Sequence, residues 1–268
     1  MLLSKIFVYP IKSTAGVCLD SGEVGPRGLV YDRHWALVDD DNNVVTAREH
    51  PALLRLSAEL EGSLLSVIEN GKLQVKIPLD VDAEASQVEI QVFDAAGTGV
   101  IASAEVNDWF SGFLGAKCRL VFMSKQSSRS VIADVGGSPG DVVSFADSCP
   151  LMMLSEATLE ELNGRLDRTI PMVQFRPNLV VTGCDESAED SWQRIRIGEC
   201  EFEMLGRVKR CVFATINPDS QVPDDQQEPL RTLSTYRQHE DGGVAFGRHL
   251  IARRFGKISC GDKVEIIH

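Results

Sequence analysis

Short apolar stretches separated by polar turns dominate the first half of the chain. This spacing predicts strands at residues 6–11, 35–38, 44–46, 64–68, 73–77, 88–93 and 119–122. Asn70-Gly71 lies between two of these stretches and is a strong hairpin signal, because both residues accept the positive φ angles of a tight turn. Many short strands at this spacing indicate a barrel or a sandwich.

A helical period interrupts the strand pattern at residues 105–114, and Gly115 is expected to end this helix. The apolar residues on its predicted inner face are Val106, Trp109, Phe110, Phe113 and Leu114. Residues 124–149 are rich in Ser, Gly and Asp and predict a long irregular connection. Connections of this length are usually functional.

Strands dominate again toward the end of the chain. They are expected at residues 179–182, 195–197, 201–205, 212–216 and 263–267, with helices at 156–162 and 229–237. Ser155 is the expected N-cap of the first of these helices. The predicted fold class is mainly β (α+β), with a few short helices.

Composition narrows the function classes. The 268 residues carry a net charge of −12, which argues against nucleic-acid binding and against attraction to an anionic membrane. No apolar run approaches the roughly 20 residues of a membrane span. The seven cysteines are scattered and form no C-x-x-C pair, so a zinc site or a disulfide framework is not expected. A reducing, cytoplasmic compartment fits best.

Cys211 has the most distinctive surroundings of the seven cysteines. It follows Lys209 and Arg210 and precedes the predicted strand at 212–216. Neighbouring positive charge favours the thiolate, which is the form that binds metals or attacks electrophiles. Taken alone, the same residues also fit an inert, buried cysteine.

Further cations stand at predicted strand boundaries. Lys12 ends the first predicted strand, Arg33 opens another, and Arg176 with Asn178 precedes the strand at 179–182. Brought together, they would form a pocket for an anion, because arginine binds phosphate through two parallel hydrogen bonds. Each cation alone would be an ordinary surface residue, so the prediction depends on the set.

With these residues, the chain resembles the MOSC-domain proteins, and within that family it is most similar to the amidoxime-reducing component branch. The resemblance covers nearly the whole chain. The segments that carry it are Tyr9-Pro-Ile-Lys-Ser13, Asp32-Arg33, Asn178-Leu-Val-Val-Thr-Gly183, Arg210-Cys211, Pro218-Asp219, Glu228-Pro-Leu230 and Gly261-Asp262.

The resemblance implies two β-barrel-like lobes, an N-terminal MOSC β-barrel domain at residues 1–123 and a MOSC domain at 124–268, with a molybdenum cofactor (molybdopterin) in a cleft between them. Cys211 matches the thiolate ligand of the metal and a catalytic position. The matching cofactor-binding residues are Lys12, Ser13, Arg33, Ser148, Arg176, Asn178 and Arg210. Asp147, in the loop that should border the pocket, is a candidate catalytic proton donor. Relatives carry a small polar residue where this chain has Lys209.

The activity that the resemblance implies is reduction of N-hydroxylated compounds such as amidoximes and hydroxamic acids, with release of water. The chain ends at Ile267-His268, directly after its last predicted strand. Unless the natural chain is longer, we expect electrons from a separate flavin reductase, ferredoxin or cytochrome-type protein. Two alternatives use the same cysteine without turnover, namely a sulfur carrier holding a persulfide and a carrier of the molybdenum cofactor.

Overall fold

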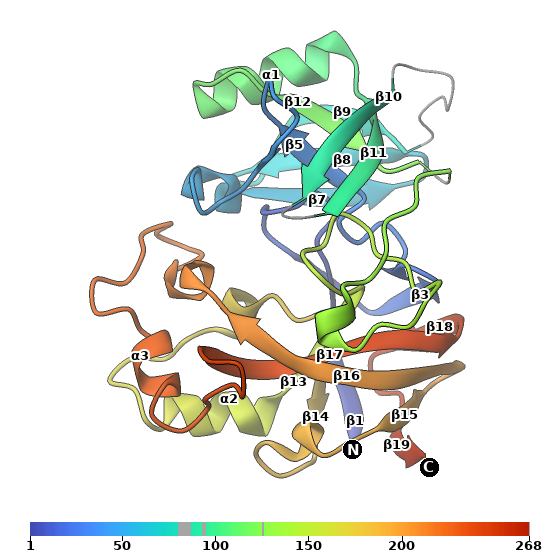
Figure 1. Ribbon diagram of the computed structural model, residues 1–268. Helices are drawn as coiled ribbons and strands as arrows, with labels where there is room; N and C mark the ends of the chain where they lie inside the picture. The colour runs from blue at the N-terminus through green and yellow to red at the C-terminus, as the bar shows by residue number, and fades with distance from the viewer. Residues whose placement is uncertain (80–86, 93–94, 125, 268) are drawn as a thin grey trace.

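The computed structural model describes residues 1–79, 87–92, 95–124 and 126–267, and strands make up most of the fold (Figure 1). Two lobes lie one above the other in this view, and few short helices accompany the sheets. The mainly β prediction is therefore confirmed.

The upper lobe contains a five-stranded sheet in the order β10-β11-β12-β5-β6 and a three-stranded sheet, β7-β8-β9. The bounds are β5 Trp35–Val38, β6 Val44–Val45, β7 Leu56–Glu61, β8 Leu64–Glu69, β9 Lys72–Pro78, β10 Gln87–Val92, β11 Ala95–Ile101 and β12 Arg119–Phe122. Helix α1 (Ala104–Leu114) packs Val106 and Phe110 into the core beside Trp35. Gly115 ends this helix in the left-handed conformation (φ 64°), as the sequence predicted. The short 3₁₀ helix η1 (Pro51–Arg55) leads into β7.

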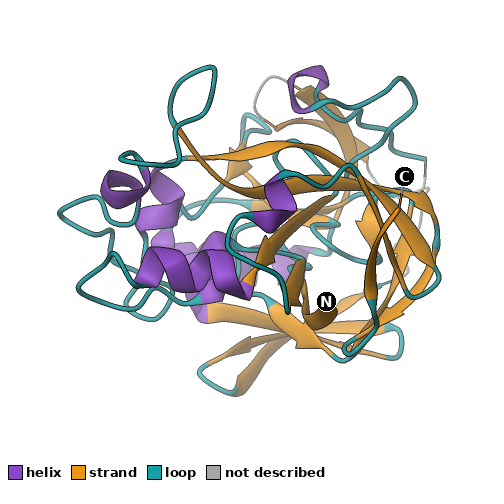
Figure 2. Cartoon of the chain, turned by 90° about the horizontal axis from the view of Figure 1, so that it is seen from below, coloured by secondary structure: helices purple, strands orange, loops and turns teal. Residues whose placement is uncertain are grey.

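The lower lobe contains an eight-stranded sheet in the order β19-β15-β16-β17-β13-β14-β1-β2 and a three-stranded sheet, β18-β3-β4. The bounds are β1 Leu2–Val8, β2 Val17–Leu19, β3 Ser21–Gly25, β4 Gly28–Leu29, β13 Leu151–Ser155, β14 Leu179–Thr182, β15 Arg194–Ile197, β16 Cys200–Arg210, β17 Val244–Arg254, β18 Gly256–Ser259 and β19 Val264–Ile267. Figure 2 shows these strands curving round one side of the lobe, with helices gathered on the other.

Short helices complete the lower lobe. Their bounds are α2 Glu156–Asn163, α3 Leu230–Leu233, η2 Ala133–Val135, η3 Met172–Phe175, η4 Ala188–Asp190 and η5 Val212–Thr215. Ser155 caps α2 by accepting a hydrogen bond from the Thr158 amide, as predicted.

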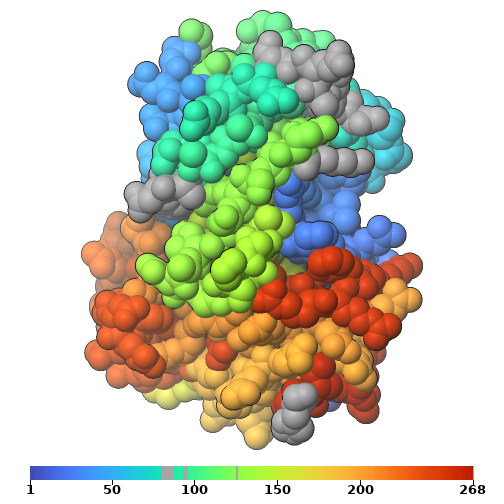
Figure 3. Space-filling view, turned by 45° about the vertical axis from the view of Figure 1, so that its right-hand side comes forward, coloured from blue at the N-terminus to red at the C-terminus, as the bar shows by residue number. Residues whose placement is uncertain are grey.

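The N-terminal strands belong to the lower lobe, although they come first in the chain. β1 pairs antiparallel with β14, and β3 pairs with β18. The segment that connects β12 to β13 runs from the upper lobe down over the lower one, and its green surface bridges both in Figure 3. The division of the chain at residues 123 and 124 stays a sequence prediction, since strands from both sides of it share one sheet.

The strand predicted at residues 212–216 is wrong, and the reason lies in how its side chains pack. Residues 212–216 form no strand, because Val212–Thr215 is the 3₁₀ helix η5 and Cys211 follows the end of β16. The apolar side chains of this run separate: Ala214 packs in the lower lobe and Ile216 in the upper-lobe core. An apolar run can therefore reflect packing between two lobes as well as a strand.

Other elements differ in length or extent. The helix expected at 229–237 is shorter in the structure and spans only Leu230–Leu233. Strand β1 ends at Val8, four residues before Lys12. Arg33 occupies a turn with φ 51° and β5 begins only at Trp35. Of the strand expected at 88–93, residue 93 lies outside the described residues.

Candidate active site

A cavity of about 420 Å³ lies where residues of the two lobes meet, within the size range of small-molecule sites. All nine residues selected from the sequence line it, and they come from five separate segments: Lys12, Ser13, Arg33, Asp147, Ser148, Arg176, Asn178, Arg210 and Cys211. The fold thus brings the whole set together, while the role of each residue remains a prediction.

Cys211 presents an exposed thiol to this cavity. It lies between the last residue of β16 and η5, and its carbonyl accepts a hydrogen bond from the Ala214 amide at 2.9 Å. The Arg48 Nη2 atom lies 3.7 Å from its Sγ. An exposed sulfur beside a guanidinium is open to a metal or an electrophile.

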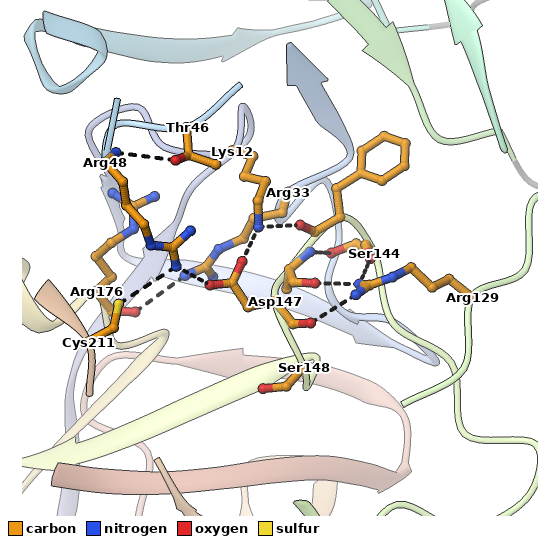
Figure 4. A network of polar contacts seen from close by, with 12 residues as sticks. Lys12, Arg33, Thr46, Arg48, Arg129, Ser144, Asp147, Ser148, Arg176 and Cys211 are labelled. Carbon is orange, nitrogen blue, oxygen red and sulfur yellow. Dashed lines mark hydrogen bonds and ion pairs between the residues drawn. The ribbon is translucent and has the colours of Figure 1, made fainter. Parts of the chain in front are cut away.

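Asp147 connects the two lobes through its carboxylate (Figure 4). One oxygen accepts a hydrogen bond from Lys12 Nζ, and the other accepts from Arg48 Nη2 at 3.0 Å. Burial alone would raise the pKa of Asp147, but the positive charges of Lys12 and Arg48 outweigh burial and hold this pKa well below its usual range. Asp147 is therefore a charged carboxylate at neutral pH.

Lys12 is the buried partner in this network. Its side chain is 7% exposed, and Nζ also donates to the Phe145 carbonyl at 2.9 Å. Burial lowers the pKa of Lys12, and the charge of Asp147 opposes that shift. A buried ammonium of this kind depends on its carboxylate partner.

Arg129 fixes the segment that carries Asp147. Its guanidinium donates to the carbonyls of Ser144 (3.0 Å), Ala146 and Asp147 (2.8 Å), as Figure 4 shows. The side chain is buried, and burial lowers its pKa. This arginine satisfies backbone groups that no strand ladder covers.

Arg33 and Arg176 form a second positive group around Tyr9. Their guanidinium carbons lie 4.2 and 4.1 Å from the centroid of the Tyr9 ring, a distance typical of cation–π contact. Both backbones have positive φ, 51° and 56°, which is uncommon for residues with a Cβ. Burial, and then repulsion from Arg33, lowers the pKa of Arg176 to about 10. An anion placed here would relieve that repulsion.

Asn178 and Arg210 form hydrogen bonds to other groups of the protein through their side chains. Asn178 Oδ1 accepts from Arg33 Nη1 (3.1 Å) and from the Met152 amide (3.2 Å). Arg210 donates to the carbonyls of Phe246 (2.8 Å from Nε) and Phe175 (2.9 Å). Burial lowers the pKa of Arg210 to about 9. These two side chains shape the cavity wall, and Arg210 also adds charge to it.

The remaining two predicted residues, Ser13 and Ser148, also line the cavity. Ser13 is buried at φ 71°, directly after Lys12. Ser148 Oγ lies 3.4 Å from His249 Nε2, and both residues line the cavity. Burial, followed by the charges of Arg210 and Arg248, lowers the pKa of His249 to about 3. The imidazole is therefore neutral at physiological pH.

Sequence reasoning missed Arg48, Arg129 and His249. Arg48 follows Val44–Val45 closely, so the criterion of a cation at a strand boundary could have found it. Arg129 lies in the irregular connection, where no periodic pattern marks a buried arginine. His249 lies inside β17, a strand that was not predicted.

The charge of the cavity is opposite to that of the protein. Among the described residues that line it, seven are cationic and three acidic: Lys12, Arg33, Arg48, Arg176, Arg207, Lys209 and Arg210 against Asp134, Asp147 and Asp241. The whole chain carries −12. Such a local excess of positive charge favours an anionic ligand.

The donor set also limits what kind of metal site is possible. Within residues 1–79, 87–92, 95–124 and 126–267, no group of three or more His, Cys, Asp or Glu side chains is placed to hold a metal ion. A single exposed thiol beside an anion-binding surface fits a metal cofactor that brings its own sulfur ligands and a phosphate.

Family models match both parts of the chain. The MOSC N-terminal beta barrel domain matches residues 1–117, and the MOSC domain matches residues 140–265. None of the helices in the described part of the chain has the length and apolar character needed to cross a membrane.

Curated relatives align over nearly the full length. The chain is 32% identical to mitochondrial amidoxime-reducing component 1 of Mus musculus, covering 99% of this chain and 82% of the relative. It is 30% identical to the Homo sapiens protein of the same name, with the same coverage. It is 32% identical to mitochondrial amidoxime reducing component 2 of Bos taurus, covering 98% and 82%. The chain therefore belongs to the MOSC-domain family that includes the amidoxime-reducing components.

Proposed function

We propose that this protein is a molybdenum-cofactor-dependent reductase of N-hydroxylated compounds. Amidoximes, hydroxamic acids and N-hydroxylated bases would be converted to amidines, amides and amines, with loss of water. The names of the relatives support the reductase activity. The observation that carries the proposal is the exposed Cys211 thiol in a cavity where cations from both lobes converge.

The residues fit the chemical groups of the cofactor. Cys211 would bind the metal, since a soft thiolate suits molybdenum. Arg33 and Arg176 would hold the phosphate, because two guanidinium groups lie together at the Tyr9 ring and guanidinium binds phosphate through parallel hydrogen bonds. Ser13, Ser148 and Arg210 line the same cavity and would contact the pterin or its phosphate. When bound, the cofactor supplies two-electron redox chemistry.

The chain's own residues would position and charge the site. Asp147 is ionised at neutral pH, so we assign it the task of orienting Lys12 and Arg48 in place of donating a proton. Asn178 would keep Arg33 directed toward the cavity through its 3.1 Å hydrogen bond. Electrons would come from a separate donor protein of the flavin reductase, ferredoxin or cytochrome type.

Two carrier functions compete with this proposal. A persulfide carrier would use the Cys211 sulfur but would have no need for Arg33 and Arg176, so the charge of the cavity favours the cofactor. A carrier of the molybdenum cofactor would use the same cavity and would differ only in lacking turnover.

The test is reduction of benzamidoxime by protein from a host that makes the cofactor, with a chemical electron donor in place of the unidentified protein. We expect benzamidine to form in proportion to the bound molybdenum. Bound molybdenum without turnover would indicate a cofactor carrier. A Cys211 persulfide without bound molybdenum would indicate a sulfur carrier.

A further inference from the structure

Arg48 is held at the cavity by a turn of the upper lobe. The Thr46 hydroxyl accepts a hydrogen bond from the Arg48 amide at 3.2 Å, and the Thr46 carbonyl accepts from the His50 amide at 2.9 Å. Glu49 Oε2 accepts from the Thr46 amide at 3.2 Å and closes the turn. The position of the Arg48 backbone is thus set by local hydrogen bonds before its side chain meets the other lobe.

The Arg48 side chain then reaches two residues far away in the sequence. Nη2 donates to Asp147 at 3.0 Å and lies 3.7 Å from Cys211 Sγ (Figure 4). The two contacts differ in strength, because a charged carboxylate is a strong acceptor and sulfur a weak one. Asp147 therefore anchors the guanidinium, and the anchored group stands beside the sulfur.

Neighbouring cations have other tasks. The Lys12 ammonium donates hydrogen bonds to Asp147 and to the Phe145 carbonyl, and the Arg210 guanidinium donates to backbone carbonyls. Arg33 and Arg176 gather around Tyr9. Among the cations of the described residues, Arg48 has a hydrogen-bond contact to the Cys211 sulfur, and its side chain is still 23% exposed. A small molecule that approaches Cys211 from solvent would meet this guanidinium.

We propose that Arg48 is a catalytic residue that binds the oxygen of the N–OH group and stabilises the negative charge that develops on it. This inference rests on the proposed function. In the reaction, the N–O bond of an amidoxime breaks and two electrons enter from the external donor. The nitrogen and the departing oxygen each take one proton, and the products are an amidine and water.

The chemistry of guanidinium suits this role. It offers hydrogen-bond donors only, it keeps its charge, and it binds oxygens that carry negative charge. A donor of this kind acts mainly in the transition state, where the charge on the oxygen is greatest. Its loss should therefore lower kcat more than it changes KM.

The experiment compares Arg48→Gln and Arg48→Lys with Arg55→Gln in benzamidoxime reduction by cofactor-loaded protein. Arg55 is a matched control, since it belongs to the same lobe and pairs with Glu69. We expect Arg48→Gln to lower kcat by about 10²–10³-fold. Arg48→Lys should recover at least part of this loss because it keeps the charge, and Arg55→Gln should match the wild type.

Molybdenum content and the thermal unfolding midpoint provide readouts that do not depend on activity. For the proposal to stand, Arg48→Gln must keep the molybdenum-to-protein ratio of the wild type while kcat falls. An unchanged kcat would overturn it, and so would a loss of molybdenum in proportion to activity, which would make Arg48 a cofactor-holding residue. A wild-type protein that binds molybdenum without reducing benzamidoxime would remove the proposed function, and this inference with it.

Discussion

Two walls of the same cavity each carry a cysteine, and the two walls are built differently. Cys149 lies in the wall formed by Ala146–Cys149, where its thiol is buried and donates to the Leu250 carbonyl at 3.2 Å. Cys211 belongs to a different part of the cavity lining, after the end of β16, and its thiol is exposed. Both residues line the cavity, but of these two thiols it is that of Cys211 that is exposed.

Burial and hydrogen bonding account for the difference. Burial raises the pKa of Cys149 to about 12, so its thiolate is scarce at neutral pH. Arg129 holds the backbone of this closed wall through the carbonyls of Ser144 and Asp147. The Cys211 wall has η5 in place of a strand ladder. Proximity to the cavity therefore does not make a thiol reactive, whereas the packing around the thiol decides its reactivity.

The largest expected difference is in alkylation. A rise of the Cys149 pKa from 9 to about 12 lowers its thiolate fraction about a thousandfold relative to an ordinary thiol. Iodoacetamide at pH 8, followed by peptide mass mapping, should label Cys211 quickly and leave Cys149 unmodified. Exposed Cys18 should be labelled and serves as the positive control. Equal labelling of Cys149 and Cys211 would remove the distinction between the two walls.

Replacing Arg129 should open the closed wall. Arg129→Gln leaves buried carbonyls without a donor, and we expect a loss of about 1–3 kcal/mol in the free energy of unfolding. Labelling of Cys149 should become faster in this variant. Urea unfolding and the same mapping experiment check both outcomes. A variant with wild-type stability and a protected Cys149 would show that the wall holds without this arginine.

Asp147 should contribute less than Arg129, because its side chain is 46% exposed and solvent screens its charge. Asp147→Asn nevertheless leaves buried Lys12 without its counter-charge, so we expect a loss of about 1–2 kcal/mol in unfolding free energy. Asp241→Asn is the matched control, since it removes a pair with Lys209 at 3.2 Å on the surface. The control should lose at most about 0.5 kcal/mol, and equal losses would contradict the buried role of Lys12.

The smallest predicted effect is a pH dependence. The folded-state pKa of Asp147 is depressed, so its stabilising contribution is present above the ordinary aspartate pKa of about 3.9 and is lost as the pH falls toward the folded-state value. The difference in unfolding free energy between the wild type and Asp147→Asn should be constant above about pH 5 and shrink below about pH 4. Urea unfolding from pH 7 to pH 3 measures it. A difference that grows on acidification would reverse the assigned sign.

Local signals predicted much of the fold from the sequence. The hairpin at Asn70-Gly71 joins β8 and β9, and α1 ends at Gly115, because turn and cap residues act over a few positions. The strand expected at 212–216 failed, since its apolar residues pack in two different lobes. β17 was missed because its pairing with β16 changes register at three places, and such shifts disturb the alternation that marks a strand.

Site residues could be predicted where a cation stands at the boundary of a predicted strand. Lys12, Arg33 and Arg176 were found this way, and the structure brings them to one cavity. Arg129 and His249 were not, because their roles arise from contacts with carbonyls and side chains distant in the sequence. Such contacts exist only in the folded chain, so no local pattern encodes them.

Molybdenum content of matched cysteine variants tests the central claim most directly. Wild type, Cys149→Ser and Cys211→Ser would be purified from a cofactor-producing host, and the metal measured by mass spectrometry. We predict equal molybdenum-to-protein ratios for the wild type and Cys149→Ser, and a severalfold lower ratio for Cys211→Ser. A Cys211→Ser protein that retains the full wild-type ratio would contradict the assignment of Cys211 as the metal ligand.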